Sequence, residues 1–276
     1  MASPDADISK AGSPDGSSLD RSGSLEVRLA TTPREVEEAQ RLRYDIFYRE
    51  MTAKPSPEML ATGRDFDEYD PICDHLLVVD HDEGGKIVAT YRLMQSEGAA
   101  RSKGFYTAGE YDISAMLKAR AGQKLLELGR SCVLKPYRNG PTMQLLWRGL
   151  LVYLIRNDIA LMFGCASFPG TNPDALALQL SYLYHFHLTP EAERVRALPE
   201  RFVSMNLIGK DQIVEAEAIH SLPPLVKGYL RTGATIGDGA VIDHQFDTTD
   251  VFIYLPVASA NPRLIKHLKK RLASPS

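Results

Sequence analysis

The sequence predicts an α/β domain in which a central mixed sheet is flanked by helices. Residues 124–133 have the apolar pattern of a strand, residues 141–154 that of an amphipathic helix, and residues 159–168 that of a buried strand. A strand, helix and strand at this spacing form a βαβ unit with parallel strands and a right-handed crossover. Two earlier strands, 75–79 and 87–94, are separated by a short turn that contains glycine. They are expected to pair antiparallel, which makes the sheet mixed.

The first ordered element is expected to be a strand at Leu25–Leu29, where apolar and polar residues alternate. Thr32 and Glu35, with a proline at the first helical position between them, then mark a helix start with a capping box. Residues 1–24 are rich in Ser, Gly, Pro and Asp and lack the apolar segment of a signal peptide. We expect them to be a disordered tail before a domain over residues 25–258.

The connecting segments are less regular. Residues 54–71 are polar and acidic and are expected to form a loop near a site, and residues 95–122 an excursion with one short helix. A helix is predicted from Asn172 to about Tyr184. Residues 189–239 show no clear periodicity, and turns are predicted there at 223–224 and 237–239. A late strand is predicted at residues 250–257.

Composition excludes several classes of protein. The 276 residues are 44% hydrophobic and 24% charged, which is typical of a globular protein with a substantial core. A net charge of −3 and a pI near 6.2 argue against nucleic acid as the main partner. The apolar runs are too short to span a membrane. The three cysteines have no disulfide or zinc-site spacing, so a reducing, cytoplasmic compartment is expected.

The most informative motif is the strand at 124–133 with the loop and helix start that follow it. Glu127 lies between two leucines, and burial there makes a carboxylate more basic and suited to accept a proton from an ammonium nucleophile. The candidates for seating a phosphate-bearing thioester donor are Val133, Arg138, Asn139, Gly140 and Thr142. Free amides at a helix N-terminus and the Arg138 charge both favour a phosphate there. The pattern thus predicts acyl transfer from a thioester to an amine.

Each of these features also has a simpler explanation. An Arg-Asn-Gly sequence before a helix is often only a turn. Glu127 and Arg130 lie on opposite faces of a regular strand, unless a bulge near Gly129 brings them to one side. Standing alone, they are more consistent with structural ion pairs to loop charges than with catalysis.

Other candidates for chemistry are weaker. His185 and His187 have no neighbouring Cys or carboxylate motif, which favours packing at a helix end over a metal site. Ser131 lacks the G-x-S-x-G frame of a nucleophile elbow. Cys132 has an apolar neighbour and is expected to be a core thiol. We therefore expect neither a metal nor a covalent acyl-enzyme.

Several runs of residues resemble the acyl-homoserine-lactone synthases, in the same order along the chain. They are Arg41–Tyr48, Asp67–Asp74, Val88–Leu93 and Glu127–Arg130. The chain is more similar still to the bacterial L-ornithine N(alpha)-acyltransferases of ornithine lipid biosynthesis, because residues 222–231 and 237–243 resemble the distal half of that family. The resemblance extends from Leu25 to about Val257 and implies a GNAT-like N-acyltransferase fold that is extended by a helical insertion.

The resemblance also implies a reaction and residue roles. The reaction transfers a 3-hydroxyacyl chain from acyl carrier protein to the α-amine of L-ornithine and gives lyso-ornithine lipid, with the acyl-phosphopantetheine thioester as co-substrate and no cofactor. Arg43 and Phe47 would help to close the donor site. The amino-acid pocket would be ordered by Asp67, Asp70 and Asp74. The charged centre of the site would consist of Arg92, Glu127 and Arg130. The GNAT donor motif is only half present at 138–142, which argues against coenzyme A.

The sequence leaves alternatives to this function open. One is an acyl-homoserine-lactone synthase or an acyltransferase for another amino acid, and another is a module that only binds acyl carrier protein or a membrane. The pattern of residues 259–276 is relevant to the binding module, because it predicts a helix with one apolar face and many Lys and Arg. The basic face of this helix is either an ordinary solvated surface or a binding surface. As a binding surface it would contact anionic lipid on the inner face of the cytoplasmic membrane, or acidic acyl carrier protein.

Overall fold

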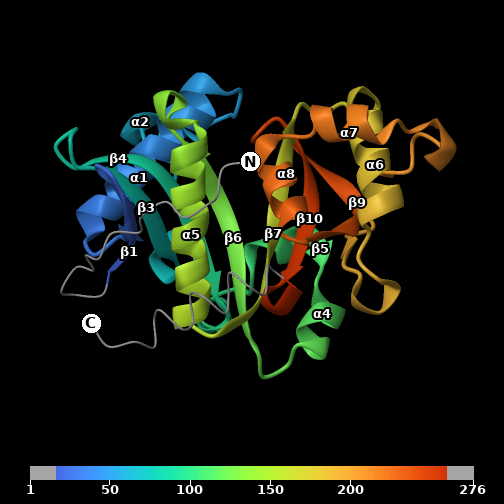
Figure 1. The fold of residues 1–276 in the computed structure, drawn as a ribbon, viewed down its shortest axis with the longest axis horizontal. Helices are drawn as coiled ribbons and strands as arrows, with labels where there is room; N and C mark the ends of the chain where they lie inside the picture. The colour runs from blue at the N-terminus through green and yellow to red at the C-terminus, as the bar shows by residue number, and fades with distance from the viewer. Residues whose placement is uncertain (1–16, 260–276) are drawn as a thin grey trace, which may run out of the picture. The chain divides into compact units, whose positions relative to one another are not determined.

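A computed structural model describes residues 17–259 of the chain (Figure 1). The contacts divide these residues into two compact units, each with its own strands and helices. Unit 1 consists of residues 17–51, 55–93 and 130–157, and unit 2 of residues 52–54, 94–129 and 158–259.

Unit 1 is built on antiparallel strands in the order β1-β2-β3-β4. They are β1 (Ser18–Ser22), β2 (Leu25–Leu29), β3 (Asp74–Asp80) and β4 (Lys86–Gln95). Strands β2, β3 and β4 and the antiparallel pairing of β3 with β4 confirm the sequence predictions. Gly84 and Gly85 have φ of +68° and +85° in the connecting turn, a conformation that favours glycine.

Strand β1 corrects the prediction that the disordered tail reaches residue 24. It pairs with β2 in a hairpin whose turn contains Gly23 at φ +61°. Leu19 is buried, and Arg148 Nε lies 2.7 Å from Asp20 Oδ2. The polar composition was misleading because a partner strand and one ion pair order this short segment. Residues 1–16 of the predicted tail lie outside the described residues.

Helix α1 (Pro33–Tyr44) begins with the predicted capping box. Thr32 Oγ1 accepts a hydrogen bond from Glu35 N (3.3 Å), and Glu35 Oε2 accepts one from Thr32 N (3.2 Å). The chain continues as a π-helical turn, Asp45–Glu50. The core beneath the helix consists of Ala39, Leu42, Ile46, Leu77, Val79, Ile87 and Cys132.

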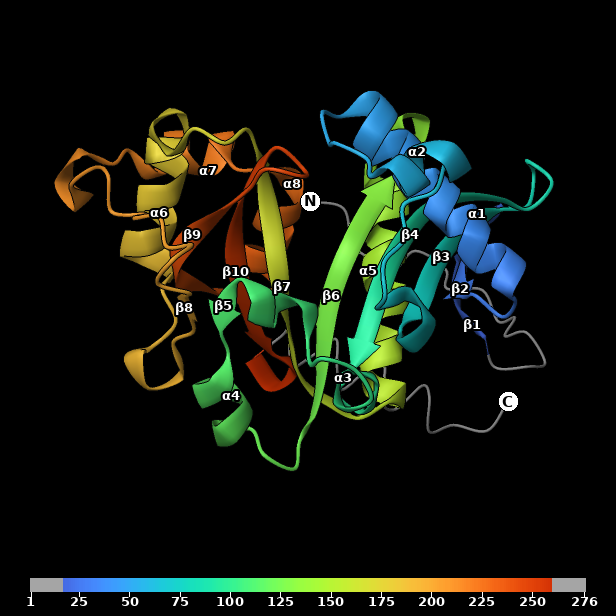
Figure 2. The same cartoon turned by 180° about the vertical axis from the view of Figure 1, so that it is seen from behind.

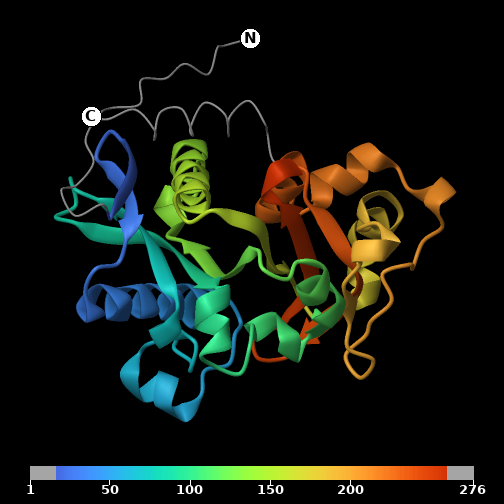
Figure 3. The ribbon, with the colours of Figure 1, turned by 90° about the horizontal axis from the view of Figure 1, so that it is seen from below.

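Helix α5 (Gly140–Arg156) confirms the helix predicted after Pro141 and covers the opposite face of the unit 1 strands, as Figure 3 shows. Side chains of a strand alternate between its two faces, so each helix meets its own set. Val27 of β2 faces α5, and a Cβ on Gly149 would lie 2.5 Å from both of its methyl carbons. This glycine therefore allows the helix to approach the sheet closely.

The segment 54–71 is not the plain loop that its composition predicts. Ser56 caps a short helix, α2 (Pro57–Thr62), by accepting a hydrogen bond from Met59 N. A 3-10 turn, η2 (Asp70–Ile72), precedes β3. A helix of six residues is too short to show a periodic pattern.

Unit 2 contains a mixed sheet (Figure 2). Its strands are β6 (Lys124–Val133), β7 (Ile159–Pro169), β10 (Thr248–Pro256) and β9 (Thr235–Asp243). Strands β6 and β7 are parallel, as the βαβ prediction requires, whereas β10 is antiparallel to both β7 and β9. The parallel register ends where Glu127 pairs with Phe163. From Arg130 onward, β6 belongs to unit 1.

The excursion between β4 and β6 contains more structure than the one short helix predicted. It consists of α3 (Ser96–Ala100), the 3-10 turn η3 (Tyr106–Gly109), β5 (Tyr111–Asp112) and α4 (Ser114–Ala119). Strand β5 pairs with the equally short β8 (Arg196–Ala197), which in turn pairs with β9. The pairing ties the excursion to the sheet of unit 2.

The predicted helix after Asn172 is present as α6 (Ala177–His187). Residues 189–239, which show no clear periodicity in the sequence, contain α7 (Glu215–Ser221) and α8 (Pro224–Arg231). The predicted turn at 237–239 is wrong, because these residues lie within β9. Gly239 has φ +89°, and a Cβ there would lie 2.5 Å from the Phe202 ring. The glycine serves close packing rather than a change of direction.

The predicted C-terminal helix covers residues 259–276, and all of these except Ser259 lie outside the described residues. The boundary of the predicted domain at residue 258 therefore stays a prediction. Within residues 17–259, no helix has both the length and the apolar character that crossing a membrane requires.

Candidate functional site

A buried network of arginines and aspartates occupies unit 1. The arginines lie on α1, β4 and β6, and the aspartates lie between α2 and β3. The members are Arg43, Asp65, Asp67, Asp70, Arg92 and Arg130. With equal numbers of each sign, the formal charges cancel within the network, as burial of so many ionised groups requires.

Arg43 lies at the centre of the network and is 0% exposed. Its Nε lies 2.7 Å from Asp65 Oδ2, and its two terminal nitrogens donate to the two oxygens of Asp70 at 3.1 and 2.8 Å. Such a bidentate pair fixes both side chains. Although burial alone would raise it, the charge and hydrogen bonds of Arg43, with the charge of Arg92, hold the pKa of Asp70 well below its ordinary value.

Arg92 and Arg130 join Asp67 to the same network. Arg92 Nη1 donates to Asp67 Oδ1 (2.5 Å) and to Asp70 Oδ1 (3.2 Å), and Arg130 Nη2 donates to Asp67 Oδ2 (3.2 Å). Arg130 has φ +53°, so the strand departs from regular geometry one residue after Gly129. The Asp67 and Arg130 side chains, 20% and 12% exposed, are the most accessible members of the network.

The structure thus brings together many of the residues predicted to bind substrate or to catalyse. Those in the network are Arg43, Asp67, Asp70, Arg92 and Arg130. Asp74 is not among them, since its carboxylate accepts a hydrogen bond from Tyr153 (2.6 Å), and Phe47 packs against the core beneath α1. Asp65 was not predicted as a site residue, although it lies in the acidic segment 54–71.

Of the residues predicted to seat the donor phosphate, Asn139, Gly140 and Thr142 lie at the start of α5, whereas Val133 ends β6 and Arg138 precedes the helix. The expectation that the amides of the helix start are free is wrong for Thr142 and Met143. Asn139 Oδ1 accepts a hydrogen bond from Thr142 N (3.0 Å), and Asn139 O accepts one from Met143 N (3.2 Å). Pro141 has no N–H to offer. The asparagine that precedes Gly140 caps the helix itself and uses the amides that a phosphate would need.

Arg138, the cation predicted beside that phosphate, also has protein partners. Its Nε donates to Val133 O (2.8 Å), and its terminal nitrogens pair with the Glu50 carboxylate. The Arg138 side chain is 40% exposed, and an exposed pair of this kind contributes little and competes weakly with another anion. The role of these residues in donor binding stays a prediction.

In unit 2, the carboxylate of Glu127 holds the η3 turn. Oε2 accepts a hydrogen bond from Tyr106 N (2.8 Å), and Oε1 accepts from Thr107 N (2.6 Å) and from the Thr107 hydroxyl. Glu127 is 4% exposed, so its predicted burial is confirmed. With both oxygens used as acceptors, this side chain orients the turn.

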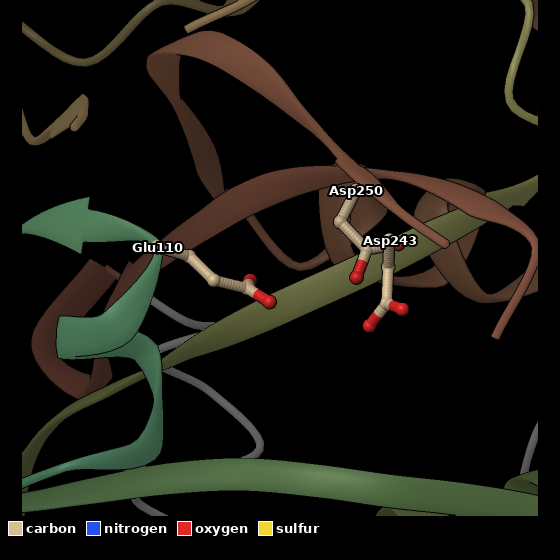
Figure 4. Close-up of side chains that lie close together, drawn as sticks. All are labelled: Glu110, Asp243 and Asp250. Atoms are coloured by element: carbon tan, nitrogen blue, oxygen red, sulfur yellow. The ribbon is translucent and has the colours of Figure 1, made fainter. Parts of the chain in front are cut away.

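The η3 turn leads directly into a second group of carboxylates, in which Glu110 approaches Asp243 of β9 and Asp250 of β10 (Figure 4). All three are buried, and one oxygen from each lies within 4.8 Å of the others. Cys165 Sγ donates to Glu110 Oε2 (3.1 Å), and Arg201 Nη1 lies 3.8 Å from Oε1. Burial, and then the charge of Asp250, raise the pKa of Glu110 to about 7. The group is suited to a cation and to a mobile proton.

Sequence reasoning missed Glu110 because its neighbours come from distant parts of the chain. Tyr111, the next residue, fixes the arrangement: its hydroxyl donates to Gly239 O (3.1 Å) and to Asp250 O (3.0 Å). Tyr111 is 0% exposed, so these bonds are shielded from water. The only sequence signal was the resemblance of residues 237–243 to the family's distal half.

An apolar pocket of about 520 Å³ also adjoins the η3 turn. Phe105 and Ala108 line it, whereas Thr107 between them contacts Glu127. Further lining residues are Ser96, Ala99, Ala100, Lys103, Gly104, Tyr111, Asp112, Ile113, Ser114, Leu117 and Leu198. The turn therefore separates an apolar space from a polar one.

The weaker candidates have structural roles. His185 Nε2 bonds to Ile208 O (2.9 Å), and the His187 ring packs edge-on against Tyr182, so both take part in packing at the end of α6. Burial raises the pKa of Cys132 to about 12, which agrees with the predicted core thiol.

Comparison with known proteins shows the family. Residues 42–148 match the model of the acetyltransferase (GNAT) domain. Over 253 residues, the chain is 49% identical to the L-ornithine N(alpha)-acyltransferase of Brucella abortus (strain 2308), and the alignment covers 90% of each protein. The chain belongs to the L-ornithine N(alpha)-acyltransferase family. The resemblance and the GNAT-like fold class predicted from the sequence are thereby confirmed.

A second relative agrees with membership of the L-ornithine N(alpha)-acyltransferase family. The protein of that name from Agrobacterium fabrum (strain C58 / ATCC 33970) is 45% identical over 251 residues, which cover 90% of this chain and 86% of that protein. Among solved structures, an N-acyl amino acid synthase from uncultured soil microbes has a TM-score of 0.47 and 11% identity, over 84% of this chain and 91% of that chain.

Proposed function

We propose that the chain is an N-acyltransferase that transfers a 3-hydroxyacyl chain from acyl carrier protein to the α-amine of L-ornithine. The observation that carries this proposal is the 49% identity, over 90% of both chains, to a protein named L-ornithine N(alpha)-acyltransferase. The choice of acyl carrier protein rests on the family resemblance and on the incomplete coenzyme A motif at 138–142. The product would be lyso-ornithine lipid.

The reaction requires a neutral amine. The α-ammonium of ornithine loses a proton, and its nitrogen attacks the thioester carbonyl carbon. The C–N bond forms and the C–S bond breaks, and the phosphopantetheine thiolate leaves and takes up the second proton that the nitrogen loses as it becomes an amide. A carboxylate that exchanges protons near neutral pH is a suitable acceptor for the first proton.

Within this proposal, Glu110 accepts that proton. It lies beside Asp243 and Asp250, whose charges attract a cationic amine. Glu127 acts as a positioning residue, because it holds Thr107, whose carbonyl in turn accepts a hydrogen bond from Glu110 N (2.9 Å). Within this proposal, Glu127 thus orients the base, whereas its sequence position predicts the proton acceptor itself.

The arginine and aspartate network is proposed to contribute through its accessible members. Arg130 suits the carboxylate of an amino acid, and Asp67 suits an ammonium group. Arg43, Arg92 and Asp70 are more deeply buried and act as the frame that holds these two side chains.

The function is tested by incubating the purified protein with 3-hydroxyacyl-acyl carrier protein and a panel of amino acids, followed by mass analysis of the lipids. Acylated ornithine is expected to dominate. Consumption of S-adenosylmethionine with release of a lactone would instead select the lactone synthase. Absence of turnover with every amine would favour a binding module.

The proton acceptor is tested by the substitutions Glu110→Gln and Glu127→Gln, with the exposed Glu97→Gln as control. Loss of a general base lowers kcat by about 10²- to 10⁴-fold, which is the effect expected at Glu110. The wild-type rate should rise with pH through about 7, and this dependence should persist in the Glu127 variant but vanish in the Glu110 variant. Full turnover and an unchanged pH profile in the Glu110 variant would contradict the assignment.

A further inference from the structure

We propose that the pocket beside the η3 turn binds the fatty acyl chain of the donor, and so sets the chain length of the product. The inference rests on the proposed function, which supplies an acyl thioester as substrate. The occupant is a single hydrocarbon chain, with its carbonyl end toward the turn.

The lining of the pocket fits a hydrocarbon. Most of its surface is apolar and comes from Phe105, Ile113, Leu117 and Leu198, with alanines between them. The polar members of the lining are Ser96, Lys103, Asp112 and Ser114. A volume of about 520 Å³ lies within the range of roughly 300–1,000 Å³ typical of small-molecule sites. Each methylene that leaves water for such a wall contributes about 0.8 kcal/mol, or roughly a fourfold factor in affinity.

The position of the pocket favours the donor chain over an unrelated apolar ligand. Phe105 and Tyr111, at the two ends of the η3 segment, line the pocket. Between them, Thr107 contacts Glu127 and Glu110 joins the carboxylate group. Seven consecutive residues, 105–111, thus contribute both to an apolar wall and to the polar groups proposed to receive the amine. An acyl chain needs this adjacency, because its hydrocarbon must be dry while its carbonyl meets a nucleophile.

Small side chains keep the pocket open. Ala100 and Ala108 line the pocket and are exposed. A larger side chain at either position therefore fills part of the pocket without disturbing the core. Ala115 lies on α4 between two lining residues, Ser114 and Leu117, but does not itself line the pocket and is also exposed. It therefore provides a control for the same addition of bulk.

The experiment compares Ala100→Trp with Ala115→Trp. The quantity measured is the ratio of kcat/KM for 3-hydroxypalmitoyl- to 3-hydroxyoctanoyl-acyl carrier protein, with L-ornithine as acceptor. If tryptophan excludes two methylenes, the ratio should fall about fifteenfold in the Ala100 variant. It should stay within about twofold of the wild type in the Ala115 variant.

A second measurement avoids dependence on turnover. Displacement of a fluorescent fatty acid by free 3-hydroxypalmitate should show a Kd raised about fifteenfold in Ala100→Trp and unchanged in the control. If circular dichroism shows that Ala100→Trp is unfolded, Ala108→Trp takes its place in both measurements. A wild-type protein that binds 3-hydroxypalmitate but acylates no ornithine would overturn the proposed function and leave the pocket standing. An active wild type whose chain-length ratio and Kd are unaffected by the pocket variants would overturn the pocket alone.

Discussion

Replacement of Arg43 by methionine tests whether the buried network holds unit 1 together. The change removes the guanidinium from between Asp65 and Asp70 but retains a long side chain. The two aspartate side chains are only 1% and 3% exposed, so water cannot take over the lost interactions. Removal of one partner from a buried ion pair costs about 3–5 kcal/mol of unfolding free energy. We expect a loss of about 4 kcal/mol.

The loss is measured by urea unfolding, followed by circular dichroism, and corresponds to a fall of roughly 10 °C in Tm for a chain of this size. Arg41→Met is the matched control on the same helix. Arg41 is 55% exposed and lies 3.4 Å from Glu37, and such a surface pair contributes less than about 1 kcal/mol. If both variants unfold within about 1 kcal/mol of each other, the reasoning is refuted.

The same network gives a dependence on pH. Because the pKa of Asp70 is held below its ordinary value, the unfolded chain binds more protons than the folded one in acid. The stability that Asp70 contributes is therefore present above the unfolded pKa of about 3.9 and is lost as the pH falls toward the folded value. The difference in unfolding free energy between the wild type and the Arg43→Met variant should accordingly become smaller in acid.

Further predictions concern unit 2 and the packing of α5. Tyr111→Phe removes a buried donor to two main-chain carbonyls and should lower the unfolding free energy by about 1–3 kcal/mol in urea; an unchanged midpoint would exclude this role. Burial raises the pKa of Glu110 to about 7, so the folded chain keeps a proton that the unfolded chain releases; stability should fall by about 3 kcal/mol as the pH rises from 4.5 through 7. That slope should disappear in Glu110→Gln, and equal slopes would contradict the account. Gly149→Ala should lower Tm despite the higher helix propensity of alanine, and an added Val27→Ala should restore it; a higher Tm in the single variant would argue against the close approach.

Local sequence signals predicted the fold well where neighbours along the chain determine the structure. The capping box at Thr32 and Glu35 depends on residues three apart, and the βαβ unit on periodicity within each element. Strand β1 and the glycines at 237–239 were misjudged, because their conformations depend on distant partners. Pairing with β2 orders the first, and packing against Phe202 constrains the second.

The candidate site shows the same difference between features that depend on neighbours along the chain and features that depend on distant partners. The resemblance pointed to Arg43, Asp70 and Arg92, but their mutual pairing requires α1, η2 and β4 to be assembled. Glu110 escaped notice because its chemical character arises from Asp250, far along the chain, and from burial. A helix start with its own asparagine cap likewise resembles an empty anion site until its hydrogen bonds are known.

The most direct test of the central claim is to locate the acyl group in the product by tandem mass spectrometry. A single turnover of the purified protein with 3-hydroxyacyl-acyl carrier protein and L-ornithine is predicted to give an amide on the α-nitrogen. An amide on the δ-nitrogen, or an acyl group that stays on the carrier protein, would contradict the account.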